Sequence, residues 1–507
     1  MGRGCLGTQV AGAWRRNNFP MADLKFTDVQ IRELFGSEDA ESESADRFQE
    51  YFVKNRAYEN LRSNLPLRIL VGHKGVGKSA LLRYSHEEDR AQGVLSIFLK
   101  PDDLSDLLKV GADAEINSLI DAWKNGIKRA VADKAVENMT EGKIDEVDQG
   151  VVTFGARKLS AIIRDALRAY KPEIADAAQS IIYDNFLSKN RVNIYIDDID
   201  RGWSARPQDI INISALINAL KDISSKDENV QCRLAIRTDV YFLVRTSDES
   251  TDKIEQDIIR LHWTNDEILR LMAFRISTYF KLPLTRIDIA HLSQNQITVQ
   301  ILSHVMEPKF QGRGKWENER VHRVIMSLCR ARPRDLVKLL HGAAREAAEK
   351  GASKIATQHF LDSFESYSEE RLQDLFNEFR SEVANIDKFI MQFKPSKVQR
   401  TTKENYHYTN DQIISRIKQA RSAAPVRFAS GRIVTDKAIL TFLYKIDFVI
   451  ARFNENDDVK WRFYDQGRFL AHEATDFGNS WEIHPAYRWA LQPNDVQGVI
   501  NTVSLPS

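Results

Sequence analysis

The sequence has little cysteine, no long apolar run and almost no net charge. Only three cysteines occur among 507 residues, widely spaced and without a C-x-x-C pair. This spacing argues against a disulfide framework and a thiolate zinc site, and it fits a reducing cytoplasm. Because no run of eighteen apolar residues occurs, no transmembrane helix is expected. The net charge of +1 gives no global electrostatic argument for a nucleic acid or a membrane surface.

The beginning of the chain also lacks the features of a signal peptide. Arginines flank an apolar stretch over residues 10–14, but this stretch is short and contains a glycine. We expect residues 1–20 to be a disordered extension. Met21 is a second candidate start of the protein.

A phosphate-binding pattern is the most informative feature that is present. Residues 72–79 fit G-x-x-x-x-G-K-[ST] at every fixed position, after an apolar strand over 67–71 and before a predicted helix. The alternative is a glycine-rich turn with an ordinary surface lysine. The flanking strand and helix favour the P-loop, and nucleotide binding is assigned to Gly72, His73, Lys74, Gly75, Val76, Gly77, Lys78, Ser79 and Ala80.

The residue types in this loop suit a nucleoside triphosphate. Glycines let backbone N–H groups turn inward around a phosphate, and the following helix presents its positive end to it. Lys78 is placed to reach the β- and γ-phosphates, and the Ser79 hydroxyl to hold Mg²⁺. The sequence therefore predicts ATP and Mg²⁺ as cofactors.

A second motif ends the apolar run Val192–Ile196 with two aspartates. A carboxylate at the end of a buried strand helps hold Mg²⁺ in P-loop enzymes, so Asp197 is assigned to the metal. Asp198 occupies the position where many such ATPases carry a water-activating glutamate. Since aspartate is one methylene shorter, hydrolysis is expected to be slow. The alternative is an aspartate pair that caps a strand–helix turn.

Strands alternate with long helices through the first half of the chain. This order predicts an α/β fold with a parallel sheet and a nucleotide at the carboxyl ends of its strands. We expect mostly amphipathic helix over 112–190, with a break near 142–155, and a helix over 210–223. The expected strands cover residues 67–71, 94–99, 192–196, 232–237 and 258–263.

Two arginines complete the predicted site. Arg237 closes the fourth strand, where a polar side chain can sense the γ-phosphate. Pro333 suits the first turn of a helix, which places Arg334 at the mouth of that helix. A sensor arginine and a surface ion pair are equally good explanations of Arg334. The predicted catalytic set is Lys78, Asp198, Arg237 and Arg334.

These four motifs resemble the AAA+/STAND branch of P-loop ATPases. In particular they are similar to archaeal origin-recognition-type and related bacterial ATPases, whose helical lid carries a similar Pro-Arg. The resemblance spans about residues 67–380. It implies a P-loop sheet of the ASCE type with a helical lid, and ATP binding with slow hydrolysis that switches domain arrangement or assembly.

After residue 380 the pattern changes. Helices over 409–423 and from 438 onward precede short strands over 461–464 and 481–483, with a turn signal at 478–479. This order predicts a winged-helix-like module. The full predicted division is an extension over 1–20, a helical lead-in over 21–64, an ATPase core over 65–265, a lid over 266–380 and the winged-helix-like module over 381–507.

Three functions remain open at this point. The first is an ATP-driven conformational switch that engages a protein or DNA partner, with nucleotide-dependent homo-oligomers as a candidate state. The second is an initiator-like ATPase that binds DNA through the C-terminal module, and the third is a nucleotide-binding structural subunit with negligible turnover. A GTPase is less favoured because no N-K-x-D motif occurs. No membrane partner is expected.

Overall fold

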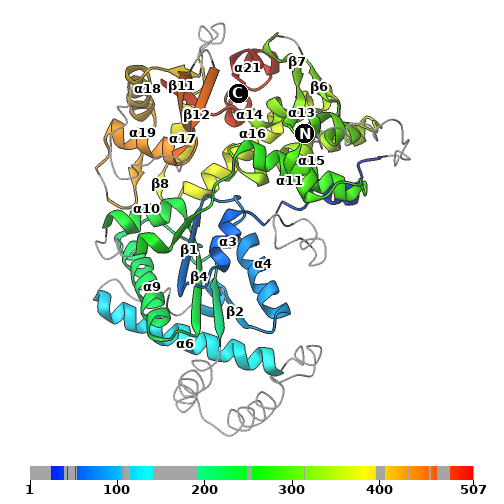
Figure 1. Cartoon of the computed structure of the whole chain (residues 1–507). Helices are drawn as coiled ribbons and strands as arrows, with labels where there is room; N and C mark the ends of the chain where they lie inside the picture. Colours follow the sequence, from blue (N-terminus) through cyan, green and yellow to red (C-terminus); the bar gives the residue numbers. More distant parts are fainter. Residues whose placement is uncertain are drawn as a thin grey trace, which may run out of the picture.

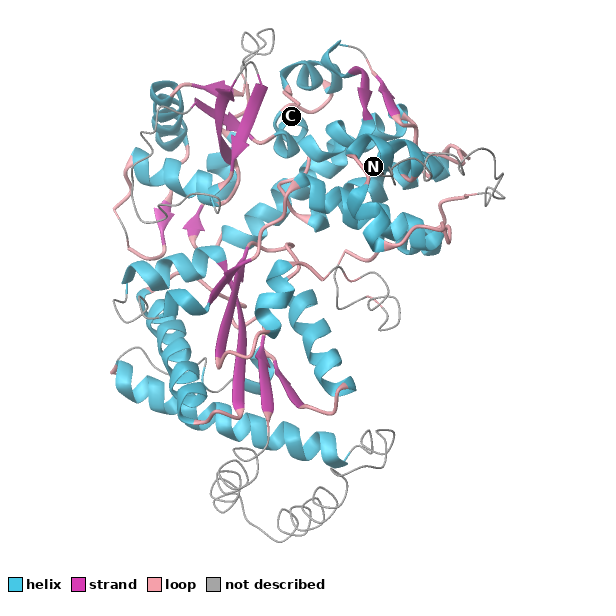
Figure 2. Cartoon of the chain, viewed as in Figure 1, coloured by secondary structure: helices cyan, strands magenta, loops and turns pink. Residues whose placement is uncertain are grey.

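The computed structural model describes residues 24–38, 43, 52, 54–104, 107, 115–140, 191–247, 254–312, 314–395, 406–431, 433–455, 458–464 and 480–505. Figure 1 shows a sheet flanked by helices at one end and two further units at the other. One of these units is mainly helical and the other contains a second sheet (Figure 2). None of the helices in the described ranges is both long and apolar enough to cross a bilayer.

The main sheet has five parallel strands in the order β2-β3-β4-β1-β5. Its strands are nearly continuous apolar runs, as expected for a parallel sheet that is buried on both faces. Gly72 pairs with Arg237, so the start of the P-loop and the end of β4 lie side by side at the carboxyl edge. The predicted parallel P-loop sheet is confirmed. Its strands are β1 (Leu67–Gly72), β2 (Leu95–Leu99), β3 (Val192–Ile196), β4 (Val230–Arg237) and β5 (Ile258–Arg260).

Helices cover the sheet on both sides (Figure 1). Pro207 occupies the first turn of α9, and the Asp209 side chain accepts the Arg206 N–H at 3.1 Å, which fixes where that helix begins. The predicted helix over 210–223 is therefore part of a longer one. Of the helix predicted over 112–190, residues 116–140 are helical, and the predicted break lies outside the described residues. The helices of this unit are α4 (Lys78–Ala91), α6 (Ile116–Thr140), α9 (Pro207–Lys226) and α10 (Thr238–Ser247).

The helical unit follows directly. Thr264 and Glu267 form a capping box that starts α11, and Pro333 starts α15. The N-terminal helix α1 shares the apolar core of this unit through Ile31 and Leu34. Its elements are α1 (Asp28–Phe35), α11 (Asn265–Tyr279), α12 (Arg286–His291), α13 (Gln294–Gln300), α14 (Val321–Ser327), α15 (Pro333–Glu349), α16 (Thr357–Phe379) and the hairpin β6 (Lys309–Gln311)–β7 (Glu317–Arg320). Helix α3 (Arg56–Arg62) packs instead against α4 and β5, beside the main sheet (Figure 1).

The C-terminal unit combines helices with an antiparallel sheet in the order β12-β11-β13-β9. The predicted strand over 461–464 is the end of β12, and the predicted turn at 478–479 lies outside the described residues. A two-residue pair of β8 and β10 lies beside the helices. The elements are β8 (Val383–Ala384), α17 (Ile386–Met391), β9 (His407–Tyr408), α18 (Asn410–Ala423), β10 (Arg427–Phe428), α19 (Asp436–Lys445), β11 (Val449–Glu455), β12 (Asp458–Arg462) and β13 (Ser480–Ile483).

The end of the chain returns to the helical unit. Helices α20 (Arg488–Leu491) and α21 (Val496–Thr502) contribute Trp489 and Val499 to the core of that unit. The Trp489 ring lies 4.8 Å from the Phe364 ring of α16. The C-terminal residues therefore join the two upper units of Figure 1.

Candidate nucleotide site

The loop between β1 and α4 has the backbone of a P-loop. Gly75 and Gly77 have φ angles of +82° and +97°, in the left-handed region that glycine adopts at little cost. Gly77 is the N-cap of α4, so the free N–H groups of that helix face the loop. At Gly72 an added Cβ would lie 2.8 Å from Val76 Cγ2. The loop is therefore shaped to surround an anion closely.

A tryptophan that the sequence analysis did not assign holds this loop. Trp263 follows β5, is buried, and donates its indole N–H to the Val76 carbonyl oxygen at 2.7 Å. A single tryptophan after a strand carries no specific signal in the sequence. The contact depends on β5 lying next to β1 in the sheet.

Lys78 lies inside the loop. Its Nζ donates to the Gly72 carbonyl oxygen at 2.7 Å and to the His73 carbonyl oxygen at 3.1 Å. Burial lowers the pKa of Lys78, while the carboxylates of Asp200 and Asp197 oppose this shift. A phosphate bound here would favour the charged ammonium further.

The two residues predicted to hold Mg²⁺ are brought together. Asp197 at the end of β3 is buried, and its carboxylate accepts hydrogen bonds from the Ser79 hydroxyl and, at 2.9 Å, from the Asp198 N–H. Burial raises the pKa of Asp197 in spite of Ser79 and Lys78. A hydroxyl beside a buried carboxylate is a donor set that suits Mg²⁺.

Asp198 differs sharply from its neighbour. Its φ of +57° turns the chain, and its side chain is half-exposed and paired with Arg201 at 3.1 Å. It still lines the same cavity as Lys78. The backbone thus gives the two aspartates different environments, in keeping with the different roles that the motif predicts for them.

Asp200 is a third acid, to which the sequence motifs assigned no role. It is buried, and its Oδ2 accepts the backbone N–H of Arg237 at 2.9 Å. Burial raises its pKa, against the opposing charges of Arg237 and Lys78. Asp200 thus links the chain after β3 to the end of β4, directly beside the P-loop lysine.

Arg237 is held by two carboxylates from different parts of the chain. Its guanidinium donates to both oxygens of Asp239, from Nε at 3.0 Å and from Nη2 at 2.5 Å. Glu378 of α16 lies 3.7 Å from Nε, and the Phe379 ring lies 5.3 Å from the guanidinium carbon. Burial would lower the pKa of Arg237, but Asp239 and Glu378 raise it well above its usual range.

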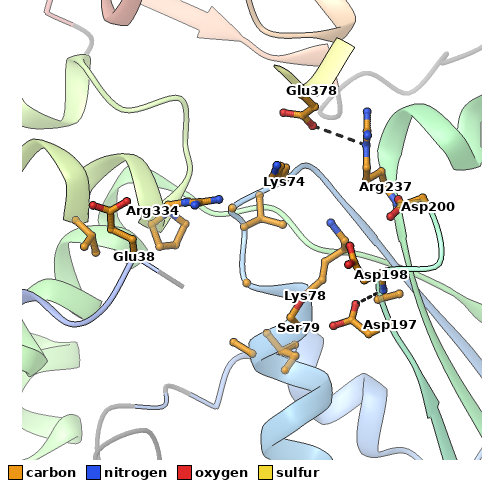
Figure 3. Close-up of a pocket in the computed structure, with 18 of the residues that line it drawn as sticks. Glu38, Lys74, Lys78, Ser79, Asp197, Asp198, Asp200, Arg237, Arg334 and Glu378 are labelled. Carbon is orange, nitrogen blue, oxygen red and sulfur yellow. Dashed lines mark hydrogen bonds and ion pairs between the residues drawn. The ribbon is translucent and has the colours of Figure 1, made fainter. Parts of the chain in front are cut away.

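Arg334 lies over the P-loop. An added Cβ at Gly75 would be 3.2 Å from both Cβ and Cδ of Arg334. Figure 3 shows Arg334 on one side of the pocket and Arg237 on the other, with the end of Lys78 between them and Asp197 lower in the view, near Ser79. The cavity has a volume of about 690 Å³ and is lined by all four residues. Every predicted catalytic residue, Asp198 included, therefore borders one cavity.

Apolar side chains also line the cavity. They are Phe52, Val76, Leu271 and Val337, which come from the lead-in, the P-loop and helices α11 and α15. Four segments that are far apart in the sequence meet here. Charged side chains line the cavity on both sides, since Glu38 lies beside Arg334 and Asp197 lies near Lys78 (Figure 3).

A buried polar junction joins the P-loop to both upper units. Arg332, at the N-cap of α15, donates to the Lys74 carbonyl oxygen at 3.3 Å and forms an ion pair with Asp447 of the C-terminal unit. The His73 side chain is buried and its Nε2 lies 4.0 Å from Asp447 Oδ2. Sequence reasoning missed this junction because it joins residues from three separate parts of the chain.

Comparison with known proteins gives one matching family model and one curated relative. The model described as the FunZ-associated C-terminal helical domain matches residues 289–376, which lie in the helical unit. A "putative transposon gamma-delta 80.3 kDa protein" of Escherichia coli (strain K12) is 21% identical over 501 residues. This match covers 91% of this chain and 67% of the relative.

Solved structures with similar folds belong to the origin-recognition group that the motifs resemble. A Cdc6p structure from Pyrobaculum aerophilum has a TM-score of 0.31 at 11% identity and covers 93% of this chain and 99% of its own. The Aeropyrum pernix ORC2 protein, in ADPNP and ADP complexes, has a TM-score of 0.39 at 12% identity, with 87% and 88% covered. Drosophila ORC bound to DNA has a TM-score of 0.29 at 9% identity, with 97% and 95% covered. Scores this low carry no argument about function, and the chain's own sheet order and P-loop define its fold as that of a P-loop ATPase.

Proposed function

We propose that this protein binds ATP with Mg²⁺ and hydrolyses it slowly. The observation that carries the proposal is the convergence of Lys78, Ser79 and Asp197 at one end of the cavity. The P-loop N–H groups and Lys78 would hold the phosphates, and Ser79 and Asp197 the metal ion. Bound Mg²⁺ would neutralise charge that develops on the phosphates during hydrolysis.

The proposed hydrolysis depends on Asp198 and the two arginines. Asp198 would orient the attacking water, and its short side chain and half-exposed position support a slow rate. Arg237 and Arg334 border the cavity from the sheet and the helical unit, so both are placed to stabilise charge on the γ-phosphate.

The proposed role of the nucleotide is to switch the arrangement of domains. Arg334 and Arg332 lie two residues apart at the start of α15, one against Gly75 and the other paired with Asp447. A change at the phosphates would therefore reach the C-terminal unit through one helix terminus. A protein or DNA partner and nucleotide-dependent assembly are the proposed outputs, in the cytoplasm, where the buried free thiols of Cys232 and Cys329 would stay reduced.

One observation favours a second candidate, an initiator-like ATPase that binds DNA. Three strands of the C-terminal unit pair in the order β9-β13-β11. Helix α17 precedes these strands in the chain, and helices α18 and α19 lie between β9 and β11. This order supports the predicted winged-helix-like module. DNA-stimulated hydrolysis with a steep dependence on salt would favour this candidate. Nucleotide binding without phosphate release would favour a structural subunit instead.

The direct test is Lys78→Ala, measured by calorimetric titration with Mg-ATP and by phosphate release. We expect affinity to fall at least about tenfold and phosphate release to fall about a hundredfold or more, because the cation beside the phosphates is lost. Lys128→Ala, on helix α6, is the control and is expected to behave as wild type. Full ATPase activity in Lys78→Ala would refute the assignment of the P-loop.

A further inference from the structure

An acidic residue of the helical unit lies inside the proposed phosphate end of the cavity. Glu378 is the residue before the last of α16, and its side chain is only 6% exposed. It lines the cavity together with Lys78 and Arg237 (Figure 3). A carboxylate in this place is unexpected, because it would repel a triphosphate.

Its partner Arg237 also binds a second carboxylate. Asp239 takes two hydrogen bonds from the guanidinium, and Glu378 adds a second negative charge at 3.7 Å. One buried cation is thus shared by two buried anions, and Asp200 accepts the backbone N–H of the same arginine. Lys78 also interacts electrostatically with Asp200 and Glu378, so two cations face this end of the cavity and a phosphate can take the place of the Glu378 carboxylate beside them.

We propose that Glu378 occupies the place of the γ-phosphate at Arg237 and is displaced when ATP, but not ADP, is bound. This inference rests on the proposed function, since it requires the nucleotide to bind at the P-loop. Asp239 stays paired with Arg237 throughout, because it lies only two residues further along the chain and accepts two hydrogen bonds from the guanidinium. Glu378 has the single longer contact, and it comes from α16, outside the ATPase sheet.

Displacement of Glu378 would be transmitted to the C-terminal unit within four residues. The Ser381 hydroxyl donates to the Trp203 carbonyl oxygen at 2.8 Å, which ties the end of α16 to the ATPase unit. The Glu382 carboxylate accepts from Lys445 of α19 at 3.0 Å, and both side chains are buried. Because these contacts follow Glu378 directly, its release would loosen or shift the connection between the two units.

The test compares Glu378→Gln with a matched control on the same helix, Glu369→Gln, which is exposed. Calorimetric titration would measure the affinities of Mg-AMP-PNP, which has a γ-phosphate, and of Mg-ADP. We expect Glu378→Gln to tighten AMP-PNP binding about tenfold and to change ADP binding less than about twofold, because only the γ-phosphate competes with the carboxylate. Glu369→Gln should change neither affinity.

Hydrogen exchange on the wild-type protein provides a second measurement that needs no variant. AMP-PNP, but not ADP, should increase exchange in residues 377–391, where α16 ends and α17 lies. Unchanged or weakened AMP-PNP binding in a folded Glu378→Gln protein would overturn the inference, as would equal exchange in both nucleotides. If the wild type bound neither nucleotide, the proposed function itself would fail.

Discussion

At the scale of single residues, two adjacent aspartates have different surroundings. Asp197 is buried against Ser79, and Asp198 turns out of β3 with a positive φ and meets Arg201 near solvent. The first environment suits a metal ligand and the second a residue that can contact water. The division of roles predicted from the motif has this physical basis, and it is open to direct measurement.

Asp198→Asn should leave Mg-ATP affinity within about threefold of wild type while lowering phosphate release by about a hundredfold, as expected for loss of a general base. Asp197→Asn should weaken Mg²⁺-dependent binding instead, because the carboxylate that faces Ser79 is lost. Calorimetric titration with ATP, in the presence and absence of Mg²⁺, measures the affinity of both variants. Single-turnover hydrolysis measures their rates of phosphate release. Equal loss of ATP binding in the two variants would show that the roles are wrongly divided.

The sequence predicted the residues that share a contiguous motif, and it missed those that meet only in the folded chain. Lys78 and Ser79 follow from the P-loop pattern, because a strand, a tight loop and a helix suffice to place them. Glu378 and Asp447 lie in later helices and turns whose patterns show only amphipathic periodicity. Their proximity to the cavity depends on how the upper units pack, which local pattern does not encode.

At the scale of elements, the start of helix α15 is the joint between three parts of the chain. Ala331, which precedes Arg332, has a φ angle of +51°. Asp447, which forms the ion pair with Arg332, has a φ angle of +56°. Residues in such conformations persist only where surrounding contacts hold them. Burial raises the pKa of Asp447, and Arg332 opposes that shift.

Breaking this ion pair should therefore be costly. Arg332→Ala should lower the free energy of unfolding by about 3 kcal/mol, because it leaves the Asp447 carboxylate buried without its cation. The double variant Arg332→Met with Asp447→Leu should recover most of that loss, since apolar side chains of similar size often replace a buried pair without penalty. Urea denaturation of the single and double variants checks both values. A double variant no more stable than Arg332→Ala would contradict this account of the junction.

Elements with a clear hydrophobic pattern in the sequence were predicted correctly, whereas elements held mainly by tertiary contacts were not predicted. The five strands of the main sheet are largely apolar runs that end in, or are followed by, a polar residue, and all five were expected. The hairpin β6–β7 was not expected, because its strands are short and largely exposed. The predicted division at residues 265 and 380 remains a proposal. The apolar cores cross both boundaries, because the core of the helical unit includes Leu70 and Leu261 and the core of the C-terminal unit begins at Leu372.

At the scale of the whole molecule, the helical unit is the connection between cavity and C-terminal unit. Helix α15 begins beside the P-loop, and α16 ends beside Arg237 and continues into the C-terminal unit (Figure 1). The start of α15 and the end of α16 therefore border the same cavity. A nucleotide with a γ-phosphate should change the arrangement of the units, whereas one without it should not.

Small-angle scattering of the wild-type protein in Mg-AMP-PNP and in Mg-ADP tests this central claim most directly. A ligand shifts an equilibrium only by its difference in affinity between two states, so the profiles should differ because Arg334 gains a contact with the γ-phosphate that ADP lacks. Arg334→Ala should shrink that difference, and Arg345→Ala, at an exposed position on the same helix, should leave it unchanged. Identical wild-type profiles in the two nucleotides would contradict the switch and leave a static nucleotide-binding protein.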